Sequence, residues 1–183
     1  MTRPGDDDPV VLVDADDVQV GTAGKLEAHR RGLKHRAISV LVRNSAGQLL
    51  LQRRSPEKYH SGLLWANACC SHPLPGESTA DAARRRLQEE MGFACALTPL
   101  FTFDYRAPVS GELIENELVH VFGGSHDGQI AANPAEVVEW KWVDFEELAA
   151  DLRDRPDNYA IWFRKYVAAH GGLIAGWLAG RQD

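Results

Sequence analysis

The segment that most constrains the fold is an amphipathic helix predicted over residues 78–91. Ser78 is followed three residues later by Asp81, a spacing typical of a helix N-terminal capping box. Apolar residues then recur at three- and four-residue spacings, which predicts one buried stripe: Ala80, Ala83, Leu87 and Met91. Gly92 follows where the helix should end. A helix with one apolar face needs another layer to cover it.

Strand-like segments on both sides of this helix predict that the layer is a sheet. They lie at residues 10–13, 36–43, 48–53, 63–70, 100–105, 113–122 and 137–143, with a turn at 44–47 that predicts a hairpin. Residues 14–24 are turn-rich. Helices are expected at 25–32, 144–152, 159–169 and 173–179, with glycines 171 and 172 between the last two. We therefore predict one α+β domain over residues 9–183, with residues 1–8 as a disordered acidic arm.

Composition narrows the function classes. The chain has 183 residues, and its 20 basic and 26 acidic residues give a net charge of −6, which argues against a nucleic-acid partner. No apolar run approaches the roughly 18 residues of a membrane span, and the N-terminus lacks the apolar core of a secretory signal. The three cysteines are an odd number, and two are adjacent. We expect a reduced, cytoplasmic protein with no membrane partner.

Residues 71–93 carry acids, arginines and a glycine at a distinctive spacing. This pattern resembles the Nudix box, a loop–helix–loop that holds Mg²⁺ against a diphosphate, and the matching residues are Glu77, Arg85, Leu87, Glu89, Glu90, Gly92 and Phe93. Two positions depart from the pattern. Ser71 replaces the first glycine, and Arg86 replaces a glutamate that is a principal metal ligand in Nudix hydrolases. The second departure argues against hydrolysis.

Flanking motifs point to a more specific resemblance. They are WANACCSHP at residues 65–73, FDYRA at 103–107, ENE at 115–117 and NYAIWFRKY at 158–166. With the box, they resemble the type I isopentenyl-diphosphate isomerase family over roughly residues 25–162. The resemblance implies a Nudix-like mixed-sheet sandwich with C-terminal helices and a core at about residues 35–168. An N-terminal extension would supply a histidine and a lysine.

Glu115 and Glu117 are two residues apart on a predicted strand, so both side chains leave the same face. That face also carries Leu113, Val119 and Val121 and should point inward. Two ionised carboxylates on an apolar face are costly unless a positive group lies between them, and a metal ion would meet that need. The alternative is a bulged or edge strand whose glutamates are solvated. The residues alone favour neither.

The resemblance implies a metal shell of three histidines and two glutamates: His29, His35, His72, Glu115 and Glu117. It gives the other histidines no role: His60, His120, His126 and His170. A mixed nitrogen and oxygen shell with room for a sixth ligand suits octahedral Mn²⁺ or Mg²⁺ better than tetrahedral Zn²⁺, which is the alternative. Glu90 would hold a second ion, a Mg²⁺ that bridges to the substrate diphosphate.

The two adjacent cysteines should point to opposite sides of an extended segment, so at most one faces a given pocket. The resemblance makes Cys70, two residues before the ligand histidine, the catalytic thiol. Such a thiol should have a tuned pKa and partial access to solvent. Cys69 and Cys95 are then small buried packing residues.

A diphosphate needs positive charge, and the resemblance implies that four cations contact its oxygens: Lys25, Arg54, Lys58 and Arg86. Lysine and arginine are natural phosphate ligands. For most of these residues, taken singly, a solvated surface charge is the simpler interpretation. Arg86 is the exception, because it stands inside the box where a hydrolase carries glutamate.

Moving a double bond by adding and removing protons produces a tertiary carbocation. An aromatic face stabilises a desolvated cation by about 2 kcal/mol. The resemblance gives this role to Trp162, on a late helix, and makes Tyr105 the hydrogen-bonding support of the acid/base glutamate. Trp65, Tyr105 and Trp162 are expected to line the pocket. The remaining tryptophans are simpler as core residues: Trp140, Trp142 and Trp177.

The expected activity is the reversible 1,3-allylic isomerisation of isopentenyl diphosphate to dimethylallyl diphosphate by a monomer. Cys70 and Glu117 would face opposite sides of the allyl unit, and Tyr105 would assist. The substrate is a small-molecule diphosphate, and water must be excluded from the cation. Two other hypotheses are a Nudix hydrolase of a nucleoside diphosphate derivative and a non-catalytic, metal-stabilised interaction module.

Overall fold

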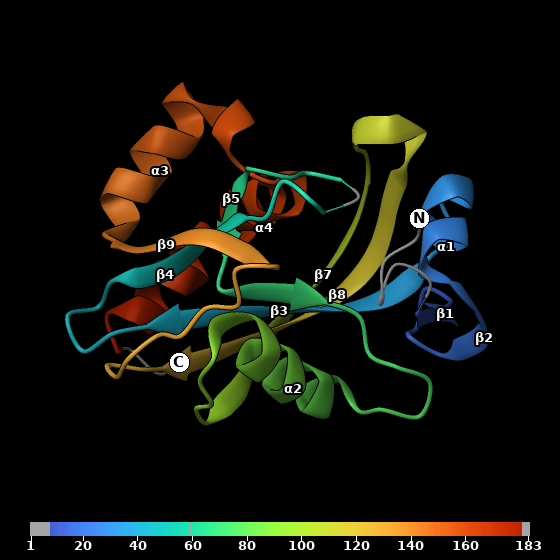
Figure 1. Cartoon of the computed structure of the whole chain (residues 1–183), viewed down its shortest axis with the longest axis horizontal. Helices are drawn as coiled ribbons and strands as arrows, with labels where there is room; N and C mark the ends of the chain where they lie inside the picture. Colours follow the sequence, from blue (N-terminus) through green and yellow to red (C-terminus); the bar gives the residue numbers. More distant parts are fainter. Residues whose placement is uncertain (1–7, 59, 181–183) are drawn as a thin grey trace.

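The computed structural model describes residues 8–58 and 60–180 and has an α+β architecture with one mixed sheet (Figure 1). The predicted acidic arm lies outside the described residues except for Asp8. The strands are β1 Pro9–Val13, β2 Gln19–Gly24, β3 His35–Arg43, β4 Leu49–Arg54, β5 Trp65–Asn67, β6 Cys69–Ser71, β7 Leu97–Pro108, β8 Ile114–Ser125 and β9 Val137–Val143. The helices are α1 Lys25–Arg31, α2 Thr79–Met91, α3 Phe145–Asp154 and α4 Ile161–Leu178, with 3-10 turns η1 Ser110–Glu112 and η2 Pro156–Asn158.

Strand β3 lies at the centre of the sheet and is buried on both faces. Its residues Ile38, Val40 and Val42 pack with helix α2, while Ala37 and Leu41 pack on the opposite face with α4. This alternation follows from the two-residue period of a strand. Figure 1 shows α2 on one side of the sheet and α3 and α4 on the other, so the predicted sandwich is confirmed.

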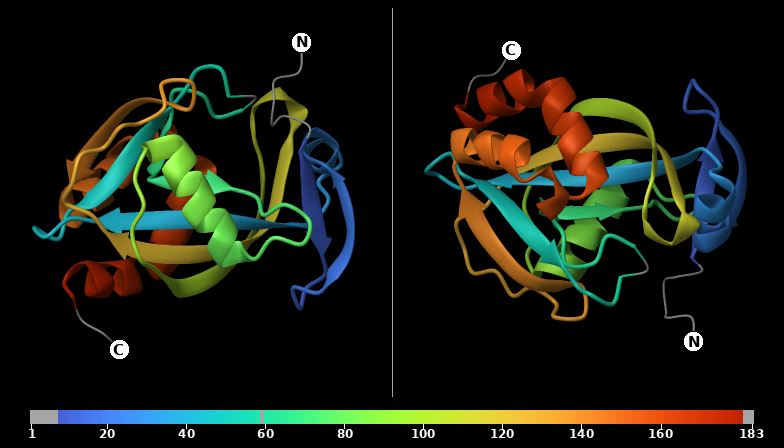
Figure 2. Two further views of the ribbon diagram at one scale, coloured as in Figure 1. Left: turned by 60° about the horizontal axis from the view of Figure 1, so that its bottom comes forward. Right: turned by 90° about the horizontal axis from the view of Figure 1, so that it is seen from above.

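The strand pairing brings distant parts of the chain to one end of β3. Strand β8 runs parallel to β3 from His35↔Glu117 to Arg43↔Ser125, and β7 pairs antiparallel with the other side of β8. Strand β6 pairs antiparallel with β3, with Cys70 opposite Ser39. The N-terminal elements β1, β2 and α1 lie together at the end where β3 begins (Figure 2).

Helix α2 begins and ends as predicted. The Ser78 hydroxyl accepts a 3.1 Å hydrogen bond from the Asp81 amide, and Gly92 ends the helix with a left-handed φ of 76°. A Cβ at position 92 would lie 2.2 Å from the Ala131 carbonyl oxygen, so both the backbone conformation and the close contact require glycine. The buried face is Ala82, Ala83, Leu87, Glu90 and Met91, with Ala80 partly buried beside it.

Several predicted elements differ from the structure. The 44–47 turn forms, but β3 and β4 pair only at Arg43↔Leu49, because β3 pairs with β6 and β8 while β4 pairs with β5 and β9. The predicted strand at 63–70 is divided into β5 and β6. Part of the turn-rich 14–24 segment is strand β2. The two C-terminal helices are one helix, α4, with a kink at His170.

Candidate active site

The two glutamates of β8 point into the interior. Glu115 and Glu117 are 3% and 8% exposed, on the same face as Leu113, Val119 and Val121. Strand β8 lies between β3 and β7, and its register with β7 is regular at Ala107↔Glu115 and Tyr105↔Glu117. The interpretation of these glutamates as solvated residues on an edge or bulged strand is therefore wrong. Two buried carboxylates on an apolar face require neighbouring positive charge.

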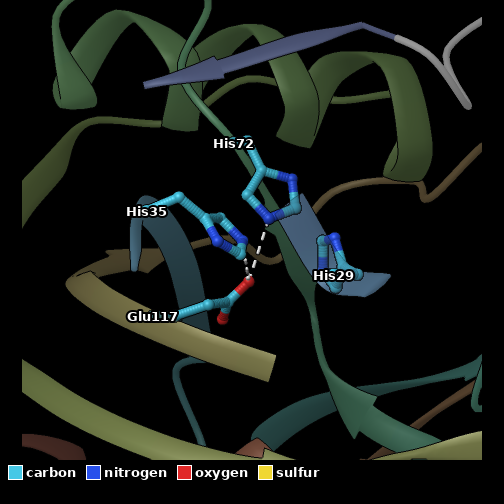
Figure 3. Close-up of side chains that lie close together, drawn as sticks. All are labelled: His29, His35, His72 and Glu117. Atoms are coloured by element: carbon cyan, nitrogen blue, oxygen red, sulfur yellow. Dashed lines mark hydrogen bonds and ion pairs between the residues drawn. The ribbon is translucent and has the colours of Figure 1, made fainter. Parts of the chain in front are cut away.

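Histidines from three separate elements surround these carboxylates. His29 comes from α1, His35 from the start of β3 and His72 from the segment after β6. Figure 3 shows His35 and His72 reaching one oxygen of Glu117, with His29 beside them. The distances from Glu117 Oε1 are 2.9 Å to His72 Nε2 and 3.5 Å to His35 Nε2, and His29 Nε2 lies 3.3 Å from Glu115 Oε2.

His60 is a member of the cluster that the sequence analysis missed. It lies in the loop between β4 and β5, is 4% exposed, and places its Nε2 2.8 Å from Glu115 Oε1. The expectation that His60 has no part in the site is wrong in this respect. The other three histidines lie elsewhere, against Asp17, Phe93 and Phe101: His120, His126 and His170 respectively.

The tautomers of two histidines suit a cation. His29 Nδ1 lies 2.7 Å from the Lys25 carbonyl oxygen, and His35 Nδ1 lies 2.8 Å from that of Leu33. Because a carbonyl only accepts, Nδ1 donates in each ring, and the Nε2 lone pair faces the cluster when the imidazole is neutral. Within the described residues, His35 Nε2 and Glu115 Oε2 are buried and make no hydrogen bond. These donors fit a divalent metal ion.

The protonation states agree with that fit. Burial would raise the pKa of Glu117, but the neighbouring imidazoles of His35 and His72 hold it well below the ordinary value. Burial lowers the pKa of His72 to about 4, which keeps its imidazole neutral. Burial would also lower the pKa of His29, but the neighbouring carboxylate of Glu115 raises it overall. The Glu115–His29 pair thus attracts positive charge, from either a proton or a metal ion.

Cys69 and Cys70 face opposite sides of the sheet. Cys69 packs in the core beneath α2, while Cys70 contacts the opposite core and lines a pocket with His72, Glu117 and Trp162. The Cys70 thiol donates to Asn67 Oδ1 at 3.0 Å, and its Sγ lies 3.2 Å from Ser39 Oγ. Burial raises the pKa of Cys70 to about 12. The thiol therefore holds its proton at neutral pH.

Tyr105 supports Glu117 from the neighbouring strand β7. Its hydroxyl donates a 2.9 Å hydrogen bond to Glu117 Oε2, the carboxylate oxygen that the histidines leave free. Burial, together with the charge of Glu117, raises the pKa of this hydroxyl well above its ordinary value. Tyr105 thus remains a hydrogen-bond donor at any pH near neutrality.

The four predicted cations all line the same pocket: Lys25, Arg54, Lys58 and Arg86. Arg86 Nη2 lies 2.6 Å from Glu90 Oε1, and Glu90 is 1% exposed on the buried face of α2. Glu136, which the sequence analysis missed, forms ion pairs with both Arg86 and Lys58. At this end of the pocket, Lys58 and Arg86 are thus ion-paired with Glu90 and Glu136.

The Nudix box itself is held by a paired clamp. Arg85 donates from Nε and Nη2 to the two oxygens of Glu77, both at 2.7 Å, and Glu77 Oε2 also accepts from the Leu74 amide at 2.9 Å. A bidentate arginine–carboxylate pair fixes orientation as well as distance. The loop that precedes α2 is thereby tied to the helix.

Trp162 is the tryptophan at the pocket. It lies in the first turn of α4, is 5% exposed, and carries the Arg54 guanidinium 4.9 Å above its ring. Two expectations about the other tryptophans are wrong. Trp65 does not line this pocket and instead lies under Lys141, whose Nζ is 4.3 Å from the ring centroid. Trp140 is 40% exposed rather than core. Tyr105 reaches the pocket through its hydrogen bond to Glu117. Trp142 and Trp177 pack against the two cores as predicted.

Comparison with known proteins gives a consistent assignment. The NUDIX domain model matches residues 33–164. "Isopentenyl-diphosphate Delta-isomerase 2" of Aromatoleum aromaticum is 56% identical over 156 residues, 85% of this chain and 82% of that protein. The Burkholderia multivorans isopentenyl-diphosphate Delta-isomerase is 48% identical over 162 residues, covering 88% and 92% respectively.

A solved structure supports the fold. A crystal structure of a Deinococcus radiodurans protein superposes with a TM-score of 0.66 at 24% identity, covering 81% of this chain and 90% of that one. This level of identity speaks to the architecture alone. The sequence matches are far stronger, and they extend over the β8 glutamates, the cysteine pair and the α2 box. The chain accordingly belongs to the isopentenyl-diphosphate Delta-isomerase family and is built on a NUDIX domain.

Proposed function

We propose that this chain catalyses the reversible 1,3-allylic isomerisation of isopentenyl diphosphate to dimethylallyl diphosphate, in isoprenoid biosynthesis. The relatives named isopentenyl-diphosphate Delta-isomerase support this substrate. The observation that carries the proposal is one pocket lined by a protonated thiol, Cys70, and an ionised carboxylate, Glu117. Isomerisation needs one group that gives a proton and another that takes one.

In the forward reaction a proton adds to the terminal alkene carbon, leaving a tertiary carbocation at C3. Loss of a proton from C2 then forms the new double bond, so no net proton is consumed. We assign the two transfers to Cys70 and Glu117 on opposite sides of the allyl unit, with their roles exchanged in the reverse direction. Tyr105 holds Glu117 by its 2.9 Å hydrogen bond and keeps the carboxylate aimed.

We assign the metal shell to His29, His35, His72, Glu115 and Glu117. The mixed nitrogen and oxygen donors suit Mn²⁺ or Mg²⁺, with Zn²⁺ as the alternative. A bound divalent cation supplies the positive charge that offsets two buried carboxylates and sets the acidity of Glu117. The chain's own contribution is orientation, because backbone carbonyls hold the rings of His29 and His35.

We assign the diphosphate end to Lys25, Arg54, Lys58 and Arg86, with Mg²⁺ held by Glu90. Arg86 occupies a position where a Nudix hydrolase has a metal-binding glutamate. A phosphate-binding cation therefore stands here in place of an acid. This change favours holding a diphosphate over cleaving it. Arg86 Nη2 lies 2.6 Å from Glu90 Oε1, so the cation assigned to the diphosphate and the carboxylate assigned to Mg²⁺ lie side by side.

Trp162 forms the hydrocarbon wall. Its ring is buried at the pocket, where a developing cation is screened from water and stabilised by the negative face of the indole. The first turn of α4, which carries Trp162, thereby shields this end of the pocket from water.

We propose that the enzyme acts as a cytoplasmic monomer on a small-molecule diphosphate. All three cysteines are free thiols, which suits a reducing compartment. Within the described residues, no helix is both long and apolar enough to cross a membrane.

The deciding experiment is incubation with isopentenyl diphosphate and Mg²⁺ in D₂O, followed by NMR. We expect deuterium to enter carbon positions of the product dimethylallyl diphosphate. Release of inorganic phosphate or diphosphate without carbon labelling would favour hydrolysis. If neither product forms and the protein unfolds when metal is removed, the result would favour a non-catalytic, metal-stabilised module.

A further inference from the structure

His60 is a buried histidine that the proposed reaction does not use. Its imidazole is almost inaccessible, at 4% exposure, and its Nε2 lies 2.8 Å from Glu115 Oε1. Buried histidines beside buried carboxylates are placed there by specific contacts, since an unpaired polar ring would be destabilising.

The surroundings of His60 fix both its ring and its backbone. The ring Nδ1 lies 3.0 Å from Ser61 Oγ, and the Trp162 indole packs edge-on at 5.9 Å between ring centroids. Arg54 donates to the carbonyl oxygens of Ser61 at 3.1 Å and His60 at 3.3 Å. The Ser61 hydroxyl can donate to Nδ1, which leaves the ring proton on Nε2, facing Glu115.

The two oxygens of Glu115 have different environments. Oε1 lies against His60, whereas Oε2 is buried, makes no hydrogen bond within the described residues and lies 3.3 Å from His29 Nε2. A carboxylate can rotate about its terminal bond, so the strand alone does not fix the plane of the Glu115 carboxylate. The contact of His60 with one oxygen holds that plane, with the other oxygen toward the histidine cluster.

We infer that His60 is a positioning residue of the metal centre: its Nε2–H donates to Glu115 Oε1 and thereby turns Oε2 toward the cation. This inference rests on the proposed metal shell, in which Glu115 is a ligand. Groups that orient metal ligands in this way strengthen metal binding by 10- to 100-fold. His60 therefore contributes to the affinity for the ion without touching it.

The test is Mn²⁺ binding to metal-free protein, measured from the EPR signal of free Mn²⁺. We expect His60→Ala to weaken Mn²⁺ binding by about 10- to 100-fold. His60→Gln keeps an amide donor near Oε1 and should restore affinity to within a few-fold of the wild type. His126→Gln, which alters a histidine stacked on Phe93 outside the cluster, is the control and should leave Mn²⁺ affinity unchanged.

A second measurement separates positioning from direct ligation. Pulsed EPR of bound Mn²⁺ counts the imidazole nitrogens, and we expect the same three in the wild type and in both His60 variants. Loss of one nitrogen in His60→Ala would make His60 a ligand and overturn the inference. The inference would also be overturned if His60→Ala left Mn²⁺ affinity unchanged, or if the wild type bound no Mn²⁺. It would equally fail if His60→Gln, with the circular dichroism of the wild type, did not restore affinity.

The proposed reaction can fail independently. If the wild type forms no deuterium-labelled dimethylallyl diphosphate but His60→Ala weakens Mn²⁺ binding, the isomerase proposal fails and the positioning role stands. If the wild type isomerises normally and Mn²⁺ affinity is the same in His60→Ala, the isomerase proposal stands and the positioning role fails.

Discussion

Cys69 and Cys70 are neighbours in the chain, yet their side chains enter different cores on opposite faces of the sheet. Strand β6 imposes this separation, because successive strand residues alternate sides. One thiol is sealed beneath α2, and the other opens to the pocket that contains His72 and Glu117.

This separation predicts different effects of two matched substitutions. Cys70→Ala should reduce turnover by several orders of magnitude while the protein remains folded, because a proton-transfer group is lost. Cys69→Ala should leave turnover near normal and lower the free energy of unfolding by about 1 kcal/mol through lost packing. Steady-state kinetics and denaturant unfolding check both. Equal loss of turnover in the two variants would contradict the assignment of Cys70.

The acidity of Cys70 gives a second prediction. With a pKa raised to about 12 by burial, the thiolate fraction should rise about tenfold per pH unit throughout the range accessible to the folded protein. Iodoacetamide labelling of Cys70, followed by site-resolved mass spectrometry, should therefore accelerate steadily between pH 7 and 10. A rate that levels off near pH 7 would indicate an acidic thiol instead.

The two proposed metal sites should respond separately to substitution. His72→Ala removes a ligand beside Glu117 and should deplete the ion in the histidine–glutamate shell, measured by elemental analysis, with loss of turnover. Glu90→Gln should leave that ion in place and raise the Mg²⁺ concentration needed for turnover. Loss of both ions in Glu90→Gln would mean that the sites are not separate.

Arg86 offers a charge-reversal test. Arg86→Glu would place a fourth carboxylate beside those of Glu89, Glu90 and Glu136, so we expect loss of isomerisation and weaker binding of diphosphate. Arg86→Lys is the matched control and should retain part of both. We expect no competent hydrolase from Arg86→Glu, since the pocket wall at Trp162 suits an alkyl group. Efficient release of phosphate from nucleotides by the wild type would contradict this view.

Trp162 tests the carbocation. Cation–π stabilisation of about 2 kcal/mol acts only when charge develops, so Trp162→Leu should slow turnover by about thirtyfold. Trp162→Phe should keep part of the rate, and the apparent affinity for isopentenyl diphosphate should change only a few-fold, because the diphosphate contacts dominate binding. Trp140→Leu, at an exposed position, is the control. Full turnover in Trp162→Leu would reduce the ring to a packing role.

Much of the site could be predicted from local sequence. The α2 caps follow from capping residues, and the shared face of Glu115 and Glu117 and the split of the cysteine pair follow from strand periodicity. That the glutamate face is buried was left open by the residues and is settled by the position of β8 between β3 and β7. Family resemblance supplied the roles of His29, His35 and His72, and the structure brings these three side chains together.

His60 and Glu136 were not predicted, for a physical reason. Each lies outside a helix or regular strand, and each meets its partner through contacts between segments distant in sequence. The loop that carries His60 has positive φ values at Ser61 and Leu63, so no periodic pattern marks which side chains turn inward. The predicted hairpin between β3 and β4 was wrong for the same reason, because β3 pairs along its length with β8, which is distant in sequence, and meets β4 at one residue pair.

The parallel register that sets His35 opposite Glu117 also bears on how the protein folds. Two ligands of the cluster come from opposite halves of the chain and meet only after β3 and β8 have joined. Parallel pairing of this range is slow, because loop closure precedes any gain from the contacts. We therefore expect the proposed metal centre to assemble late in folding, so that capture of an ion would follow the completion of the sheet rather than nucleate it.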